Sequence, residues 1–206
     1  MPKWHHQKVG SASHVHQSLR TADGKPAFYD PQADLGLSET GRHYLGGLLK
    51  YASDITWFFA PYVNSYKRFQ VGSFAPTRKV WSVDNRTAAF RLVGDNSPAV
   101  RLECRVPGAD VNPYLAIAGM LAAGIAGIEE KIEPPAPMAG DAYAGAAEHI
   151  PTTLRDAIET LHGSKMLRAA LGDAVVDHYV RAASWEQEAF NGVVTDWEIA
   201  RGFERA

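Results

Sequence analysis

The chain reads Arg-Leu-Glu-Cys-Arg from residue 101 to residue 105, so that charged and apolar side chains alternate. Successive side chains of a β-strand point to opposite faces, which places Arg101, Glu103 and Arg105 on one face. Leu102 and Cys104 share the other face, which predicts a contact with the core. The charged face favours the binding of a charged ligand, because charges are costly to bury without partners. The alternative is a solvated face with an ion pair between strands.

Composition restricts the classes of protein to which the chain can belong. With 206 residues, of which 46% are hydrophobic, it is long enough for one large domain or one and a half. The net charge of -2 indicates no overall basic surface for nucleic acid. No apolar run approaches the ~18 residues of a membrane span, and the single cysteine fits a reducing compartment. The sequence therefore predicts a soluble cytoplasmic protein that binds neither nucleic acid nor a membrane.

Strand patterns are grouped in the first half of the chain, and helix patterns dominate the second half. Alternation and flanking turn residues predict strands near 13–19, 78–83, 87–93 and 99–106. A helix is expected over roughly 39–60 after the N-cap residue Ser38. Residues 64–76 show neither period and are expected to form a loop. This order predicts an α+β fold.

The second half of the chain contains two kinds of predicted helix. Beyond Pro113 the helix is rich in alanine and glycine, which predicts close packing on the sheet or on another helix, and Pro134 ends it. The last third is helical by its apolar spacing. Its expected core residues are Ile158, Leu161, Leu167, Leu171, Val175, Tyr179 and Trp185.

Cationic and metal-ligating side chains lie in or next to the predicted strands. The arginines are Arg68, Arg86, Arg91, Arg101 and Arg105. Arginine presents a planar fork that matches carboxylate and phosphate, so several on one sheet would form a site for a polyanion. His14 and His16 share one face of the first strand and, with a carboxylate, would suit a divalent cation. For each group alone, an exposed surface residue is the alternative.

Five motifs occur in a fixed order over nearly all of residues 8–130. They are Gly10-Ser-Ala-Ser-His-Val-His-Gln-Ser-Leu19, Asn64-Ser-Tyr-Lys-Arg68, Asp84-Asn-Arg-Thr-Ala-Ala-Phe-Arg91, Arg101-Leu-Glu-Cys-Arg105 and Asn112-Pro-Tyr-Leu-Ala116. Together they resemble the C-terminal part of the glutamine synthetase catalytic domain. The resemblance implies an antiparallel sheet packed with helices, strand-rich over 8–106 and helix-rich over 111–206. It also implies that the family's N-terminal β domain and the first part of its catalytic domain are absent from residues 1–206.

The resemblance implies a reaction with ATP and a divalent cation, Mg²⁺ or Mn²⁺. Enzymes of this family phosphorylate the γ-carboxylate of glutamate, and ammonia or an amine then displaces the phosphate. By the matched motifs, His14 and Glu103 would ligate the cation that bridges the nucleotide phosphates. His16 and Ser18 would line the ATP site. Two side-chain ligands are few for a cation that takes about six, so the chain is expected to be a C-terminal fragment.

The same resemblance assigns glutamate and the transferred phosphoryl group to the arginines. Arg68 and Arg105 would bind the carboxylates of glutamate, and Gly10 would let the backbone approach this substrate. Arg86 and Arg91 would neutralise charge on the nucleotide phosphates and the transferred phosphoryl group. Arg68 and Arg86 are thus the expected catalytic residues. Positioning and charge neutralisation are what phosphoryl transfer requires of a protein.

Two positions depart from the family's common pattern. Phe74 stands six residues after Arg68, where ammonia-using members commonly carry a glutamate that binds and deprotonates ammonium. Val9 replaces the asparagine that often precedes the matched glycine. With Trp81, Phe74 resembles the branch that joins organic amines to glutamate, as polyamine and monoamine γ-glutamyl synthetases do. Tyr143 is expected to be a surface tyrosine.

Three functions remain open on the sequence. The first is an ATP-dependent glutamate–amine ligase of which this chain is the C-terminal part. The second is an ammonia-using glutamine synthetase, and the third is a non-catalytic remnant that binds nucleotide weakly or only assembles. Family members form rings with active sites between neighbouring subunits, so a complete enzyme is expected to be a homo-oligomer.

Overall fold

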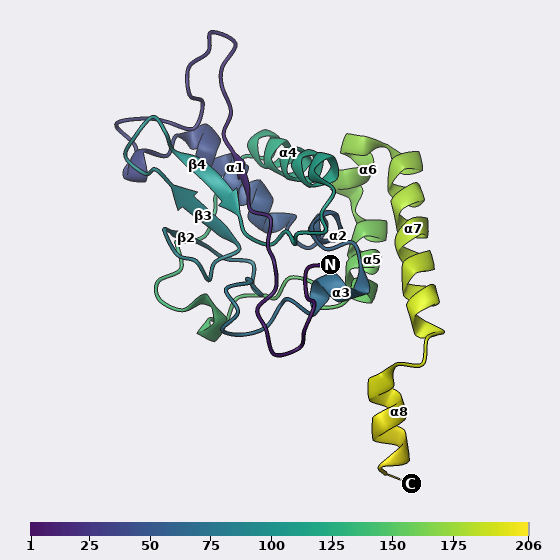
Figure 1. Ribbon diagram of the computed structural model, residues 1–206. Helices are drawn as coiled ribbons and strands as arrows, with labels where there is room; N and C mark the ends of the chain where they lie inside the picture. Colours follow the sequence, from purple (N-terminus) through teal and green to yellow (C-terminus); the bar gives the residue numbers. More distant parts are fainter. Residues whose placement is uncertain (206) are drawn as a thin grey trace.

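The computed structural model describes residues 1–205, which form a small sheet covered by helices (Figure 1). The strands are β1 (Val15–Gln17), β2 (Trp81–Val83), β3 (Phe90–Val93) and β4 (Arg101–Cys104), and the sheet order is β1-β4-β3-β2. β4 pairs antiparallel with β1 and with β3, whereas β2 and β3 run parallel. The α+β class is thus confirmed, but the sheet is mixed and not wholly antiparallel. The two strands run parallel because residues 84–89 carry the chain back to the beginning of β2, so that Phe90 pairs with Trp81, and the Asp84 amide donates to Leu92 O.

Some helices lie between β1 and β2 in the chain and the others follow β4, and together they cover one side of the sheet (Figure 1). Their bounds are α1 Glu39–Lys50, α2 Thr56–Phe59, α3 Val63–Tyr66, α4 Pro113–Glu129, α5 Leu154–Gly163, α6 Lys165–Leu171, α7 Asp173–Asn191 and α8 Asp196–Phe203. Short 3₁₀ turns lie at Asp34–Gly36 and Ala142–Ala144. The predicted helix over 39–60 is therefore interrupted between α1 and α2, and the predicted loop over 64–76 begins inside α3. No helix in residues 1–205 is long and apolar enough to cross a membrane.

The core lies between the apolar face of the sheet and α1 and α4. Leu102 and Cys104 are fully buried there, as the alternation in β4 predicts, together with Tyr44 and Leu48 of α1. α1 and α4 pack so closely that an added Cβ at Gly127 would lie 2.3 Å from His43 O. The small residues of α4 therefore allow two helix backbones to meet, and the contact fixes the helical layer against the sheet.

The C-terminal helices pack less completely than their apolar spacing predicts. α7 buries Val176 and Ala183, but Trp185 is 69% exposed and Val175 is 41% exposed, so their assignment to the core is wrong. α8 buries no residue, and Figure 1 shows it below the rest of the chain. Periodicity identifies a helix and its apolar stripe, but it does not identify which part of that stripe the chain itself covers.

Candidate active site

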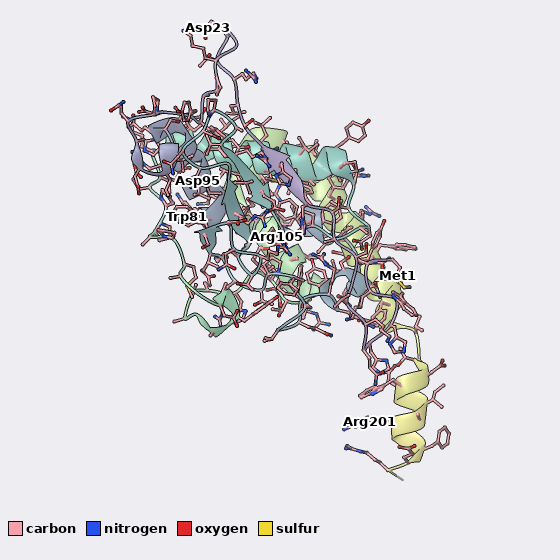
Figure 2. All side chains as sticks on the ribbon, turned by 60° about the vertical axis from the view of Figure 1, so that its left-hand side comes forward. Met1, Asp23, Trp81, Asp95, Arg105 and Arg201 are labelled. Atoms are coloured by element: carbon pink, nitrogen blue, oxygen red, sulfur yellow. The ribbon has the colours of Figure 1, made fainter. Side chains whose placement is uncertain are left out.

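A buried carboxylate, Glu103, lies at the centre of the polar face of the sheet. Its side chain is 3% exposed, and Oε1 lies 3.0 Å from His14 Nδ1, 3.1 Å from Arg105 Nη1 and 3.6 Å from His16 Nε2. Oε2 lies 2.7 Å from Arg91 Nε. We call Glu103 and these four side chains the Glu103 cluster. Figure 2 shows Arg105 near the middle of the molecule, whereas Asp23 and Arg201 lie at its margins.

The register of the sheet explains why these side chains meet. Glu103 pairs with His16 of β1 on one side and with Arg91 of β3 on the other, and directly paired residues share a face. His14 lies just before β1 on the same side, and Arg105 lies two residues after Glu103. The central strand and its two neighbours thus bring one carboxylate next to two arginines and two imidazoles.

The hydrogen bonding of the Glu103 cluster is incomplete. Glu103 Oε2 and Arg91 Nε are close, but the N–H does not point at the oxygen, and both atoms are buried without a hydrogen-bond partner in residues 1–205. Native proteins usually satisfy buried polar atoms, so each exception calls for an explanation. A ligand that accepts from Arg91 and a cation that takes Oε2 would supply the missing partners.

The environment favours the neutral form of both histidines of the cluster, because it lowers the pKa of each. Burial lowers the pKa of His14, the positive charge of Arg105 adds to this effect, and Glu103 opposes it. Burial also lowers the pKa of His16, against the opposing effect of Glu103. Neutral imidazole is the form that ligates a metal ion. His14 and Glu103 therefore fit a divalent cation chemically, although residues 1–205 contain no group of three or more His, Cys, Asp or Glu side chains suited to hold one.

Arg68 lies beside the cluster in a buried position. It is 2% exposed, Nη2 donates to Val106 O at 2.8 Å, and Nη1 is buried without a partner in residues 1–205. Burial lowers its pKa to about 10, although Asp110 opposes the shift. A Cβ at Gly10 would lie 2.4 Å from Arg68 Cγ, so glycine is required here for a close approach to the arginine. Nη2 is thus anchored to the backbone, while Nη1 has no partner in residues 1–205.

The other predicted site residues lie at the edge of the cluster. Arg105 Nε donates to Arg86 O at 3.1 Å, which fixes the backbone of that turn while the Arg86 side chain remains exposed. Ser18 is exposed just beyond β1. Arg101 Nε donates to His16 Nδ1 at 3.3 Å. The structure therefore brings Glu103 together with Arg91, Arg105 and the two histidines, and it leaves Arg86 and Ser18 exposed at the edge of the cluster.

Two loops next to the cluster contain an unusual feature each: the backbone conformation of Phe74 and a hydrogen bond of Tyr143. Phe74 has a left-handed backbone, with φ 57°, and its side chain is 59% exposed. Tyr143 is partly exposed, but its hydroxyl donates to Ala75 O at 2.9 Å, a contact that the sequence did not predict. Burial raises the pKa of Tyr143. No spacing in the sequence links residues 75 and 143, and only the turn residues around 139–145 marked a loop there.

Residues 1–202 match the family model described as the catalytic domain of glutamine synthetase. The chain belongs to the glutamine synthetase family. It is 49% identical to a gamma-glutamylethanolamide synthetase, GlnA4, of Streptomyces coelicolor, over 95% of this chain and 42% of that protein. It is 41% identical to a glutamine synthetase of Thermotoga maritima, over 98% of this chain and 47% of that protein. A solved structure described as a GmaS/ADP complex aligns with a TM-score of 0.90 and 34% identity, over 99% of this chain and 48% of that one.

The family resemblance of the motifs is thus confirmed along almost the whole chain. The chain spans less than half the length of these curated relatives. One of these relatives is named for the synthesis of gamma-glutamylethanolamide and the other for the synthesis of glutamine.

Proposed function

We propose that this chain is the C-terminal part of the catalytic domain of an ATP-dependent ligase that joins an organic amine to the γ-carboxylate of glutamate, through γ-glutamyl phosphate. The observation that carries the proposal is the Glu103 cluster. It combines a carboxylate and a neutral imidazole for a cation with arginines for anions on one face of the sheet. Phosphoryl transfer depends on such positioning and charge neutralisation.

The nucleotide end of the site is formed by β1, the Glu103 cluster and the Arg86 turn. Mg²⁺ or Mn²⁺ held by His14 and Glu103 would neutralise phosphate charge when bound, with further ligands from outside this chain. His16 and Ser18 contact ATP along the exposed side of β1. Arg91, whose Nε has no hydrogen-bond acceptor in residues 1–205, and the exposed Arg86 bind the phosphates.

The glutamate end of the site is formed by Arg68 and Arg105. Nη2 of Arg68 is occupied by Val106 O, and the unpartnered Nη1 provides the donor for a carboxylate. Gly10 permits the segment before β1 to approach Arg68 closely, so this segment borders the substrate. A complete enzyme is a homo-oligomer, because family members build active sites between subunits.

The amine is assigned from Phe74. A phenyl ring cannot hold ammonium by charge or take its proton, but an exposed ring can pack on the carbon chain of an organic amine. The 49% identity to a gamma-glutamylethanolamide synthetase favours the same branch. The similarity to a glutamine synthetase supports ammonia as the second candidate.

The test uses the full-length protein with ATP, Mg²⁺ and glutamate, and compares ammonia with a panel of primary amines. We expect phosphate release and γ-glutamyl amide, detected by mass spectrometry, to be greatest with an organic amine. Phe74→Glu should shift the preference toward ammonia, whereas Val71→Glu, at an exposed apolar position in the same loop, should not. Highest turnover with ammonia in the unmodified protein would establish the second candidate instead.

A separate titration addresses the possibility of a non-catalytic remnant. The 206-residue chain alone should bind ATP with Mg²⁺ only weakly, because it supplies two side-chain ligands for the cation. Isothermal titration calorimetry measures this directly. Tight binding by the isolated chain would contradict the need for ligands from elsewhere in the protein.

A further inference from the structure

The loop over residues 70–76 is held in a strained conformation beside the candidate site. A left-handed backbone, with φ 57°, is unfavourable at a bulky non-glycine residue such as Phe74, so surrounding contacts must maintain it. On the N-terminal side, Ser73 Oγ donates to Gln70 O at 2.5 Å and lies 3.1 Å from Arg68 O. On the C-terminal side, Tyr143 Oη donates to Ala75 O at 2.9 Å. Phe74 is therefore fixed between a contact from its own loop and a contact from a distant segment.

The segment that carries Tyr143 is itself held firmly. Arg78 Nε donates to Tyr143 O at 3.2 Å, and Arg78 Nη1 donates to Ala147 O at 2.6 Å. The Tyr143 amide donates to Asp141 Oδ1 at 3.0 Å, which caps the 3₁₀ turn. The backbone of Tyr143 is therefore held in place, and the hydroxyl of its side chain contacts the loop of Phe74.

The same segment also contacts the turn that carries Arg86. Asn85 Nδ2 donates to Gly140 O at 2.7 Å, and the Ala142 amide donates to Thr87 Oγ1 at 3.0 Å. Residues 138–147 thus connect two loops that approach the site from different parts of the chain, one with Phe74 and one with Arg86.

We propose that Tyr143 is a positioning residue that holds Phe74 against the carbon chain of the amine substrate. It also keeps the loop of Phe74 in a fixed position relative to the Arg86 turn. The substrate class is a primary amine with an apolar carbon chain next to the nitrogen. The role toward the amine rests on the proposed function, whereas the tether between Tyr143 and the loop does not. Tyr143 contacts no reacting atom, and it acts through the backbone carbonyl of Ala75.

Hydrogen exchange in the full-length protein tests the tether. Tyr143→Phe keeps the ring and removes only the hydroxyl, so amides of residues 70–77 should exchange about fivefold faster, the factor that a hydrogen bond of about 1 kcal/mol provides. Tyr51→Phe is the matched control, since it removes a hydroxyl that donates to Glu130, away from the site. Unchanged exchange in 70–77, or an equal acceleration over residues 101–104, would overturn the tether.

Kinetics tests the role toward the amine. Tyr143→Phe should raise the KM for the amine about fivefold and leave kcat and the KM values for ATP and glutamate unchanged. A residue that only supports folding would instead lower kcat with the fraction of folded enzyme. Equal effects on all three substrates would overturn the proposal. If the unmodified protein makes no γ-glutamyl amide, the proposed function fails, and hydrogen exchange still decides whether the tether exists.

Discussion

The contact between α1 and α4 is buried and apolar, whereas the Glu103 cluster is polar and only partly buried. Glu103 and Arg105 are buried, but His14 and His16 are about a third exposed. Between the helices, glycines bring two backbones together, and apolar side chains surround them. In the Glu103 cluster, charged side chains meet on the sheet, and two of their polar atoms have no hydrogen-bond partner in residues 1–205. The helix contact needs no further partner, whereas the polar atoms of the Glu103 cluster can still bind a ligand. Substitutions in the two regions should therefore separate stability from function.

The largest loss of stability is expected in the helix contact, for Gly127→Ala. The new Cβ would lie 2.3 Å from His43 O and 2.6 Å from the Cα of Gly47, so the helices would have to separate, at a cost of about 3 kcal/mol. Urea unfolding measures the change. Gly202→Ala in α8 is the control, because no atom lies within 4 Å of its Cβ and alanine favours a helix. Equal stability of the two variants would contradict the close packing.

A smaller loss is expected in the polar region, for Glu103→Gln. The substitution keeps the shape but removes the anion that Arg91 and Arg105 share, which should lower the unfolding free energy by about 2 kcal/mol, because the Glu103 side chain itself is only 3% exposed. Glu133→Gln is the matched control. Glu133 also pairs with an arginine and a histidine, but it is 56% exposed, so the change should stay within about 0.5 kcal/mol. Equal losses in the two variants would show that burial does not strengthen the cluster.

The opposite face of the same strand provides an apolar comparison. Cys104 is fully buried, and burial raises the pKa of its thiol to about 12. Because Cys104→Ala removes only a small buried group, it should lower the unfolding free energy by only about 1 kcal/mol. The thiolate is the reactive form, so a thiol reagent at pH 8 should modify the chain only as fast as it unfolds. Rapid labelling of the folded chain would place Cys104 outside the core.

The difference between the two faces of β4 was predictable, because the alternation of charged and apolar residues assigns each side chain to one face. The pattern from Arg101 to Cys104 predicts which side chains share a face, and the order of the strands brings His16 and Arg91 to Glu103. The parallel pairing of β2 with β3 was not predictable, since it depends on how the loop at Asp84 turns. The exposure of Trp185 was not predictable either, because helical periodicity does not show which apolar residues pack against the rest of the chain.

Contacts between distant loops limited the prediction of the candidate site in the same way. Motif order identifies Arg68 and Gly10, but not that Arg68 is buried with one anchored and one unpartnered nitrogen. The bond from Tyr143 to Ala75 joins segments that have neither a common period nor a common motif. Such contacts are set by the packed structure, and hence only coordinates reveal them.

The smallest effect on stability, with a large effect on activity, is expected for Arg86→Gln. Its side chain is exposed, and its charge acts in the same direction as burial to lower the pKa of Arg105, so the two cations repel each other. The unfolding free energy should therefore change by less than about 0.5 kcal/mol, and any change should be a gain. If Arg86 neutralises the transferred phosphoryl group, ligase activity of the full-length protein should fall about a hundredfold. Arg181→Gln, at an exposed arginine of α7, should change neither quantity. Full activity of Arg86→Gln would show that Arg86 does not belong to the site. A loss of stability as large as that of Glu103→Gln would show instead that Arg86 interacts with the buried part of the Glu103 cluster. The cluster would then extend further than its hydrogen bonds indicate.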